Sequence, residues 1–254
     1  MGTWRVPDQR SAQEPRLAVQ TYVFAKSGLE LPAILGAVRG AGFTAVEGGG
    51  SPSFARACVA GGVTHAGAHV ALNAFPAHSE LAEAKAISGV SDVINSGVLR
   101  WGNVTADDYG AAIPLLNEHG RKLRDLGLRL SYHNHDFEFA QLPEGTTGMQ
   151  LLLDGLDPAA VELCVDLGWV HIGGTDPRAF LRAHGARIGI VHLRDHNGTD
   201  WVPLGHGTLD LRGIAAEIAH LPHIRRIVVE QDPHPQPAEQ CRLSREWLAT
   251  TLGW

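Results

Sequence analysis

Residues 128–135 have the sequence LRLSYHNH, in which apolar and polar side chains alternate. Such alternation predicts a β-strand with one face against a core. Its two faces are Leu128, Leu130 and Tyr132 on one side and Ser131, His133 and His135 on the other. A helix is predicted before it, over 105–126, because apolar residues recur there at helical spacing between a Thr105–Asp108 capping box and Gly127. This succession of helix and strand, repeated along the chain, determines the predicted fold.

Seven more short runs rich in β-branched residues are separated by longer amphipathic stretches. The eight predicted strands are 16–22, 43–48, 63–70, 90–96, 128–135, 161–166, 187–193 and 225–231. Strands that alternate with helices predict a parallel sheet covered by helices, and eight repeats can close into a barrel. An open doubly wound sheet is the alternative, but no glycine-rich phosphate loop follows the first strand. We therefore expect an α/β protein with a single (β/α)8 TIM barrel over 16–254, after a polar, loosely attached lead over 1–15.

The composition excludes several classes of protein. The chain has 254 residues, of which 44% are hydrophobic and 19% are charged, as expected of one large globular domain. Its formal net charge of −6 argues against a surface that binds nucleic acid. No apolar run approaches the roughly 20 residues that span a bilayer. The three cysteines are widely spaced and form no CxxC pair, so a reducing, cytoplasmic location is expected.

Four predicted strands end in a metal-binding side chain on the face that points into the barrel. These residues are His133, Asp166, His192 and Glu230, which lie 33, 26 and 38 residues apart along the chain. Each interval is about one strand–helix unit, so the four side chains are predicted to meet at the carboxyl ends of neighbouring strands, where barrel active sites lie. Two imidazoles and two carboxylates suit Mn²⁺, Co²⁺, Zn²⁺ or Fe²⁺ better than Ca²⁺. We expect one divalent ion, with Mn²⁺ favoured and Mg²⁺ also allowed.

Five segments of the chain resemble the sugar phosphate isomerase/epimerase family, within the xylose-isomerase-like barrel superfamily that also holds inosose dehydratases and endonuclease-type DNA repair enzymes. They are YHNHDFEF (132–139), DLGWVHIGGTDP (166–177), HLRD (192–195), LGHGTLDL (204–211) and VEQD (229–232). The resemblance extends over roughly 16–252. Members typically bind one divalent metal through Glu, Asp, His and Glu on strands five to eight, and Asp166, His192 and Glu230 match the last three positions.

The first ligand position departs from this pattern, because His133 stands where many members have glutamate. His135 and Glu138 are the alternatives for this ligand. His133 is preferred because it has the inward phase and lies at the end of its strand.

The resemblance implies a metal-dependent isomerase or epimerase that acts on a keto sugar or a related polyol carbonyl through an enediolate. Glu230 is the expected base, with His135 as a second one. The alternatives are a dehydratase or lyase that eliminates from an inosose or a 3-keto-glycoside, and a sugar-binding barrel without catalysis. A small sugar or polyol is therefore the expected partner, and a homo-oligomer is left open.

Further polar residues near strand ends are candidates for binding the substrate. They are Gln20, Glu47, His69, Trp169, His171, Arg194 and Asp195. Asp195 is also a candidate for orienting a ligand imidazole, since such rings donate their second N–H to an acceptor. Cys164 has the inward phase but is expected to be a core residue, because nothing near it in sequence would lower its pKa.

Overall fold

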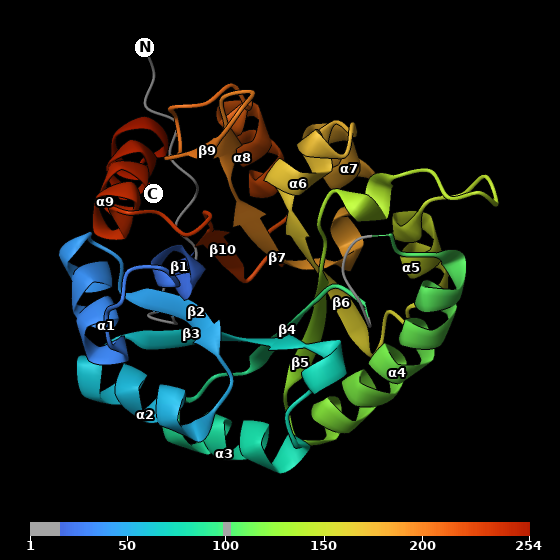
Figure 1. The fold of residues 1–254 in the computed structure, drawn as a ribbon, viewed down its shortest axis with the longest axis horizontal. Coiled ribbons are helices and arrows are strands. Elements are labelled where there is room, and N and C mark those ends of the chain that lie inside the picture. The colour runs from blue at the N-terminus through green and yellow to red at the C-terminus, as the bar shows by residue number, and fades with distance from the viewer. Residues whose placement is uncertain (1–15, 99–102) are drawn as a thin grey trace.

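A computed structural model of the chain describes residues 16–98 and 103–254, in which eight parallel strands close into a barrel (Figure 1). Around the barrel the order is β1-β10-β7-β6-β5-β4-β3-β2. The strands are β1 Leu17–Gln20, β2 Ala45–Gly49, β3 Thr64–Ala71, β4 Asp92–Ser96, β5 Arg129–His133, β6 Val161–Asp166, β7 Ile188–Leu193 and β10 Arg226–Val229. The predicted (β/α)8 barrel is therefore confirmed, while the predicted lead over 1–15 lies outside the described residues.

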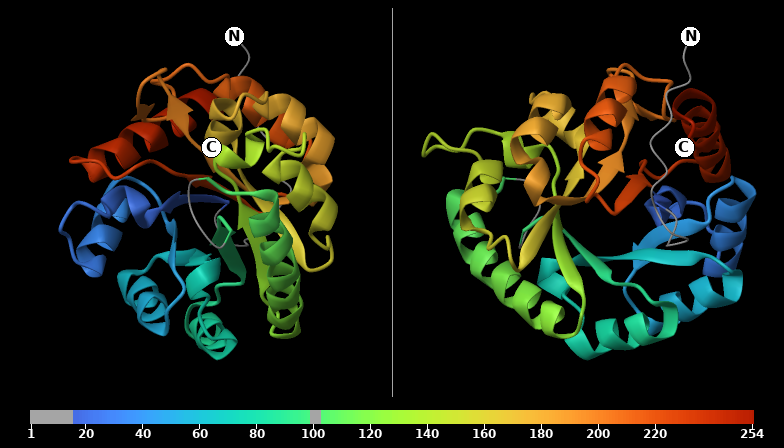
Figure 2. Two further views of the ribbon diagram at one scale, coloured as in Figure 1. Left: turned by 45° about the vertical axis from the view of Figure 1, so that its right-hand side comes forward. Right: turned by 180° about the vertical axis from the view of Figure 1, so that it is seen from behind.

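The helices form the outer layer and surround the strands (Figures 1 and 2). They are α1 Leu31–Gly40, α2 Pro52–Gly61, α3 His78–Ser88, α4 Ala106–Asp125, α5 Gly148–Gly155, α6 Leu167–Ile172, α7 Pro177–His184, α8 Leu211–Ala219 and α9 Pro237–Trp247. The predicted capping box begins α4, where the side chains of Thr105 and Asp108 each bond the other's backbone N–H. Within the described ranges, no helix is long and apolar enough to cross a membrane.

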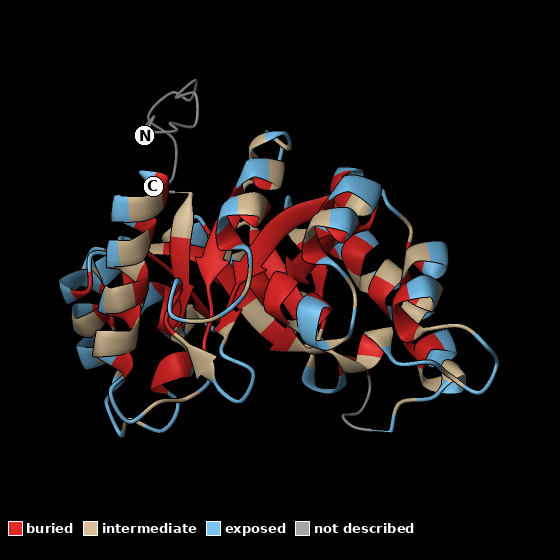
Figure 3. Ribbon diagram, turned by 90° about the horizontal axis from the view of Figure 1, so that it is seen from above, coloured by how far each residue is buried: buried red, intermediate tan, exposed pale blue. Residues whose placement is uncertain are grey.

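Strand alternation divides the buried residues into two layers. The side chains that fill the inside of the barrel are Ala18, Ala45, Ala66, Ile94, Cys164, Ile190 and Val228. Residues of the opposite phase, such as Val165, Val191 and Val229, pack in the larger core that includes the helices. Figure 3 shows the buried strands enclosed by helices whose outer surfaces are exposed. Because residues two apart share a face, Asp166, His192 and Glu230 lie one layer beyond Cys164, Ile190 and Val228.

Two strand predictions need correction. The first predicted strand is shorter than expected, because residues Thr21–Phe24 turn into a 3₁₀ helix. Between the predicted strands 187–193 and 225–231 the structure adds a small antiparallel hairpin of β8 Asp195–His196 and β9 Trp201–Val202. Strands of two residues are too short to show an alternating pattern, so they could not be predicted from the sequence.

Candidate metal and substrate site

The four predicted ligands meet at the carboxyl end of the barrel. The last residues of β5 and β6 are His133 and Asp166, and the next-to-last residue of β7 is His192. Glu230 directly follows β10. One ligand atom from each residue lies within 4.8 Å of the others. These four strands are consecutive neighbours around the barrel, which explains why residues far apart in sequence converge. The cluster has the donor types and spacing that a divalent first-row cation requires.

The charge of the cluster also fits a divalent cation. Glu47, Asp166 and Glu230 are at most 4% exposed, and Arg194 is 3% exposed. With the imidazoles neutral, as metal ligands must be, these buried residues leave two negative charges unbalanced. Burial raises the pKa of Asp166 to about 6, although the nearby Arg194 opposes this rise. A single divalent ion would neutralise this group.

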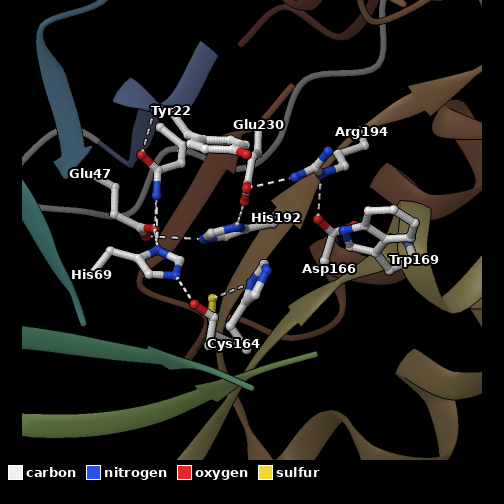
Figure 4. Close-up of polar contacts among 12 residues, drawn as sticks. Tyr22, Glu47, His69, Cys164, Asp166, Trp169, His192, Arg194 and Glu230 are labelled. Atoms are coloured by element: carbon white, nitrogen blue, oxygen red, sulfur yellow. Dashed lines mark hydrogen bonds and ion pairs between the residues drawn. The ribbon is translucent and has the colours of Figure 1, made fainter. Parts of the chain in front are cut away.

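Arg194 fixes the positions of two predicted ligands. Its Nε donates to Asp166 Oδ2 at 2.8 Å, and its Nη2 donates to Glu230 Oε1 at 2.6 Å. The guanidinium carbon lies 5.3 Å and 4.9 Å from the ring centres of Trp169 and Trp201, within the range of cation–π contact. Figure 4 shows Arg194 reaching toward both carboxylates beside Trp169. Each carboxylate oxygen has two lone pairs, so bonding to Arg194 leaves acceptor capacity for a cation.

Glu230 remains ionised in this setting. Burial opposes its charge, but Arg194 and His192 outweigh burial and hold the pKa of Glu230 well below its ordinary value. Nδ1 of His192 contacts Glu230 Oε2 directly. Glu230 is thus an unprotonated carboxylate at the surface of the pocket, as a general base must be.

Glu47 holds the other side of His192. Its Oε2 lies 3.0 Å from His192 Nε2, and its Oε1 lies 2.8 Å from His69 Nδ1 (Figure 4). Burial would raise the pKa of Glu47, but the two histidines lower it to about 2. Each nitrogen of His192 thus faces a carboxylate, with Nε2 toward Glu47 and Nδ1 toward Glu230 in the ligand cluster. A carboxylate behind a ligand imidazole is the usual arrangement of metal sites.

A pocket of about 630 Å³ opens above the cluster. Seven of the predicted site residues line it: Gln20, His69, His133, His135, Trp169, Arg194 and Glu230. Asp166 and His192 are fully buried directly behind this lining. The volume is within the range of ligand-binding pockets, and the lining mixes one indole ring with many polar groups.

His135 and Glu138 do not join the ligand cluster. The ring of His135 stacks on Phe137 with centroids 5.4 Å apart, and burial lowers its pKa to about 3. Glu138 accepts hydrogen bonds from Tyr132 Oη at 2.6 Å and from the backbone N–H of His135 at 2.7 Å. Burial raises the pKa of Glu138 to about 8. The arrangement supports His133 as the first ligand and gives Glu138 a structural role.

Three of the predicted substrate-binding residues lie elsewhere. His171 is exposed on α6 and does not line the pocket. Asp195 is buried and accepts from the backbone N–H groups of Gly205, Gly207 and Leu209, so it shapes the loop after β9 and contacts no ligand imidazole. Glu47 lies behind His69 and His192 and is absent from the lining. These residues were chosen for their position near strand ends, which does not decide the group that a side chain meets.

The comparison with known proteins is decisive for the family. A family model described as "Xylose isomerase-like TIM barrel" matches residues 78–251, more than half of the chain. The chain belongs to this family. This confirms the resemblance seen in the five sequence segments.

Within the xylose isomerase-like family, the similarity to individual proteins is lower. An inosose dehydratase of Geobacillus kaustophilus is 25% identical over 168 residues, which cover 57% of this chain and 53% of the relative. The chain thus spans about half the length of that curated relative. A sugar phosphate isomerase/epimerase of Parabacteroides distasonis superposes with a TM-score of 0.78 at 20% identity, covering 95% of this chain and 96% of the other. A 3-keto-D-glucoside 4-epimerase of E. coli gives a TM-score of 0.69 at 15% identity, covering 93% and 100%. At identities this low, the similarity to the solved structures shows a shared fold alone.

Several residues of this xylose isomerase-like pocket were not singled out from the sequence. Ser96, Tyr22 and Asp232 line the pocket. Ser96 ends the predicted strand 90–96 and Asp232 closes the VEQD segment, so a systematic survey of strand ends would have found both. Cys164, predicted to be core, is buried, but its Sγ lies 4.0 Å from His133 Nδ1 and forms a second possible ligand group with His133 and His192.

Proposed function

We propose that this chain is a metal-dependent sugar isomerase or epimerase that removes a proton next to the carbonyl of a keto sugar or a related keto polyol. The observation that carries the proposal is the convergence of His133, Asp166, His192 and Glu230 at the base of an open pocket. Family membership supports it, because the name of the structural neighbour from Parabacteroides describes the same class of reaction.

His133, Asp166, His192 and Glu230 would hold the cation, with Mn²⁺ proposed and Co²⁺, Zn²⁺, Fe²⁺ and Mg²⁺ as alternatives. When bound, such an ion polarises a carbonyl and stabilises the negative charge of an enediolate. Arg194 keeps Asp166 and Glu230 in place, and Glu47 orients His192. Because these partners are buried, the ligand set is organised before any substrate enters.

Glu230 is the proposed base. Its carboxylate lines the pocket and is held ionised, so it can accept the proton from the carbon beside the carbonyl. Trp169 offers an apolar face to the sugar ring, while Gln20 and Asp232 offer hydrogen-bonding groups to hydroxyls. This mixture suits a small polyol substrate.

Elimination from an inosose or a 3-keto-glycoside is the second candidate reaction. Glu230 is the only one of the four proposed ligands that both lines the pocket and carries a carboxylate. The ligand position where many family members have a second glutamate holds His133, whose coordinated nitrogen cannot act as a base. A site with one carboxylate base suits isomerisation or β-elimination better than proton transfer on both faces. The match to inosose dehydratases points the same way.

The test is solvent deuterium uptake by a panel of keto sugars, inososes and 3-keto-glycosides. We expect the purified protein to exchange a carbon-bound proton of at least one compound, and a chelator to stop the exchange. Glu230→Gln keeps the shape of the side chain and removes the base, so the rate should fall by at least about a hundredfold. Exchange that persists at the native rate in Glu230→Gln, or no exchange with any compound, would refute the proposal.

A further inference from the structure

We infer that Glu47, His69 and Ser96 form a second proton-transfer group, which protonates a hydroxyl of the substrate as that hydroxyl leaves. The inference rests on the proton abstraction of the proposed function, and it favours elimination, the second candidate reaction, over isomerisation and epimerisation. None of the three residues belongs to the predicted metal ligands.

The three side chains form a hydrogen-bonded chain that ends at the pocket. Glu47 Oε1 lies 2.8 Å from His69 Nδ1, and His69 Nε2 lies 2.6 Å from Ser96 Oγ. Glu47 is 1% exposed, whereas His69 and Ser96 line the pocket. A buried carboxylate that orients an imidazole, which in turn contacts a hydroxyl, is the geometry of a catalytic acid–base relay.

The relay lies on the half of the barrel that supplies no metal ligand. The proposed ligands come from β5, β6, β7 and the end of β10, which are consecutive around the barrel. Ser96, His69 and Glu47 come from β4, β3 and β2, which are consecutive on the other half. The ring centre of His69 lies 5.4 Å from that of His133. A small substrate that touches the ligand cluster therefore also reaches the relay.

The relay is better suited to transfer a proton to an oxygen of the substrate than to take a proton from a carbon. Nδ1 of His69 faces Glu47 and the amide of Gln20, and Nε2 faces Ser96, so both ring nitrogens have protein partners. The hydroxyl of Ser96 is the member of the chain that a proton from Nε2 reaches next. A serine hydroxyl is too weak a base to take a proton from carbon, but it passes protons between oxygen and nitrogen. Glu230 is then left to act at carbon.

The step balances without a further reactant. Glu230 takes the proton from the carbon beside the carbonyl, and the electrons of that C–H bond form the enediolate. As the enediolate collapses, a carbon–carbon double bond forms and the C–O bond at the next carbon breaks, with its electron pair going to the leaving oxygen. That oxygen takes the proton of Ser96, which is replaced by the Nε2 proton of a protonated His69. The products are water and an unsaturated ketone. Glu230 then loses its extra proton to solvent, and His69 regains one from solvent.

Glu47 links the relay to the ligand cluster, because its second oxygen contacts Nε2 of His192. Replacing Glu47 should therefore disturb both His192 and His69. Replacing His69 should disturb the relay alone, since no atom of His69 belongs to the groups of potential ligands among the described residues. This difference separates a proton-transfer role from a role in building the metal site.

The experiment measures solvent exchange, elimination and metal affinity in the native protein, His69→Asn, Glu47→Gln and the control His171→Asn, whose histidine is exposed outside the pocket. In His69→Asn we expect elimination to fall at least about a hundredfold, while carbon exchange changes by less than about tenfold and calorimetric metal affinity is unchanged. Glu47→Gln should lower both elimination and metal affinity. His171→Asn should match the native protein in all three. If His69→Asn does not fold, as judged by circular dichroism, His69→Gln replaces it.

Three results would overturn the inference. One is elimination at the native rate in His69→Asn. Another is the joint loss of exchange and elimination with metal still bound, which would make His69 a base at carbon. The third is a native protein that exchanges and isomerises but eliminates from no compound, a result that leaves the proposed function standing. A native protein without any exchange overturns the proposed function as well.

Discussion

Arg194 illustrates, for a single residue, how this site is held together. A guanidinium presents N–H groups in a fixed plane, so one side chain can bond Asp166 and Glu230 simultaneously. A third bond, 2.8 Å from Nη1 to Asp232 Oδ1, reaches the pocket rim. Arg194 thus holds the two proposed carboxylate ligands close together through its own hydrogen bonds.

Metal binding is the first prediction at this scale. Asp166→Ala and His192→Ala each remove a proposed ligand, and we expect both to abolish stoichiometric binding of one divalent ion, measured by elemental analysis after dialysis. His133→Ala should also lose the ion, whereas His135→Ala should retain it because His135 stacks outside the cluster. Full occupancy in Asp166→Ala and His192→Ala would show that the ligands are wrong. If His133→Ala kept the ion and His135→Ala lost it, the first ligand would be His135 and the other three assignments would stand.

Helix α4 shows how one element is fitted to the barrel. It packs against α5 and the barrel strands β5 and β6, and its buried face includes Tyr109, Leu116 and Gly120. A β-carbon added at Gly120 would lie 2.3 Å from the backbone oxygen of Ala160, before β6. Glycine is required there because the helix approaches backbone, which cannot move aside as a flexible side chain can.

The prediction for this element compares two glycines of the same helix. Gly120→Ala should destabilise the protein by about 1–3 kcal/mol, the usual cost of overpacking. Gly110 is exposed and nothing lies within 4 Å of the position of its β-carbon, so Gly110→Ala should stabilise the protein by up to about 1 kcal/mol through helix propensity. Urea unfolding followed by circular dichroism measures both. Equal effects of the two substitutions would contradict the close packing of α4 on the residues before β6.

Across the whole molecule, an ion network ties the amino ends of the strands. Asp92, which begins β4 and is fully buried, pairs at 2.9 Å with both Arg129 of β5 and Arg225 before β10. Arg225 also pairs with Glu162 of β6. The network joins segments up to 133 residues apart, at the end of the barrel opposite to the pocket. We therefore expect the charges of this network to stabilise the closed barrel and to have no role in catalysis.

The prediction for the whole molecule is a large loss of stability in Asp92→Ala. Removing one partner of a buried ion pair typically costs about 3–5 kcal/mol, but Arg129 and Arg225 are 41% and 26% exposed, so we expect about 2–3 kcal/mol. The control is Glu83→Ala, which removes a pair with Arg56 whose side chains are 54% and 62% exposed and should cost less than about 1 kcal/mol. Thermal or chemical unfolding measures both variants. A cost for Asp92→Ala as small as that of the control would contradict the network.

The sequence by itself determined the fold and the direction of the proposed ligands. Alternation along a strand is a local property, so His133, Asp166, His192 and Glu230 could be assigned to the inward face without knowledge of any neighbouring strand. Their spacing of about one strand–helix unit then predicted that they converge. The Thr105–Asp108 cap is local as well, which is why the start of α4 was predicted well.

Only the tertiary structure decided which groups these residues meet. Glu47 and His192 are 145 residues apart, and their contact depends on the order and register of all the strands between them. The register itself shifts between Leu163 and Cys164, an irregularity that sets Asp166 opposite His192. Long side chains such as Arg194 choose among many rotamers, and the choice is made by partners from other strands. Strand phase fixes the direction of a side chain within one segment. The distances between segments follow from packing, and the hydrogen bonds of this site depend on those distances.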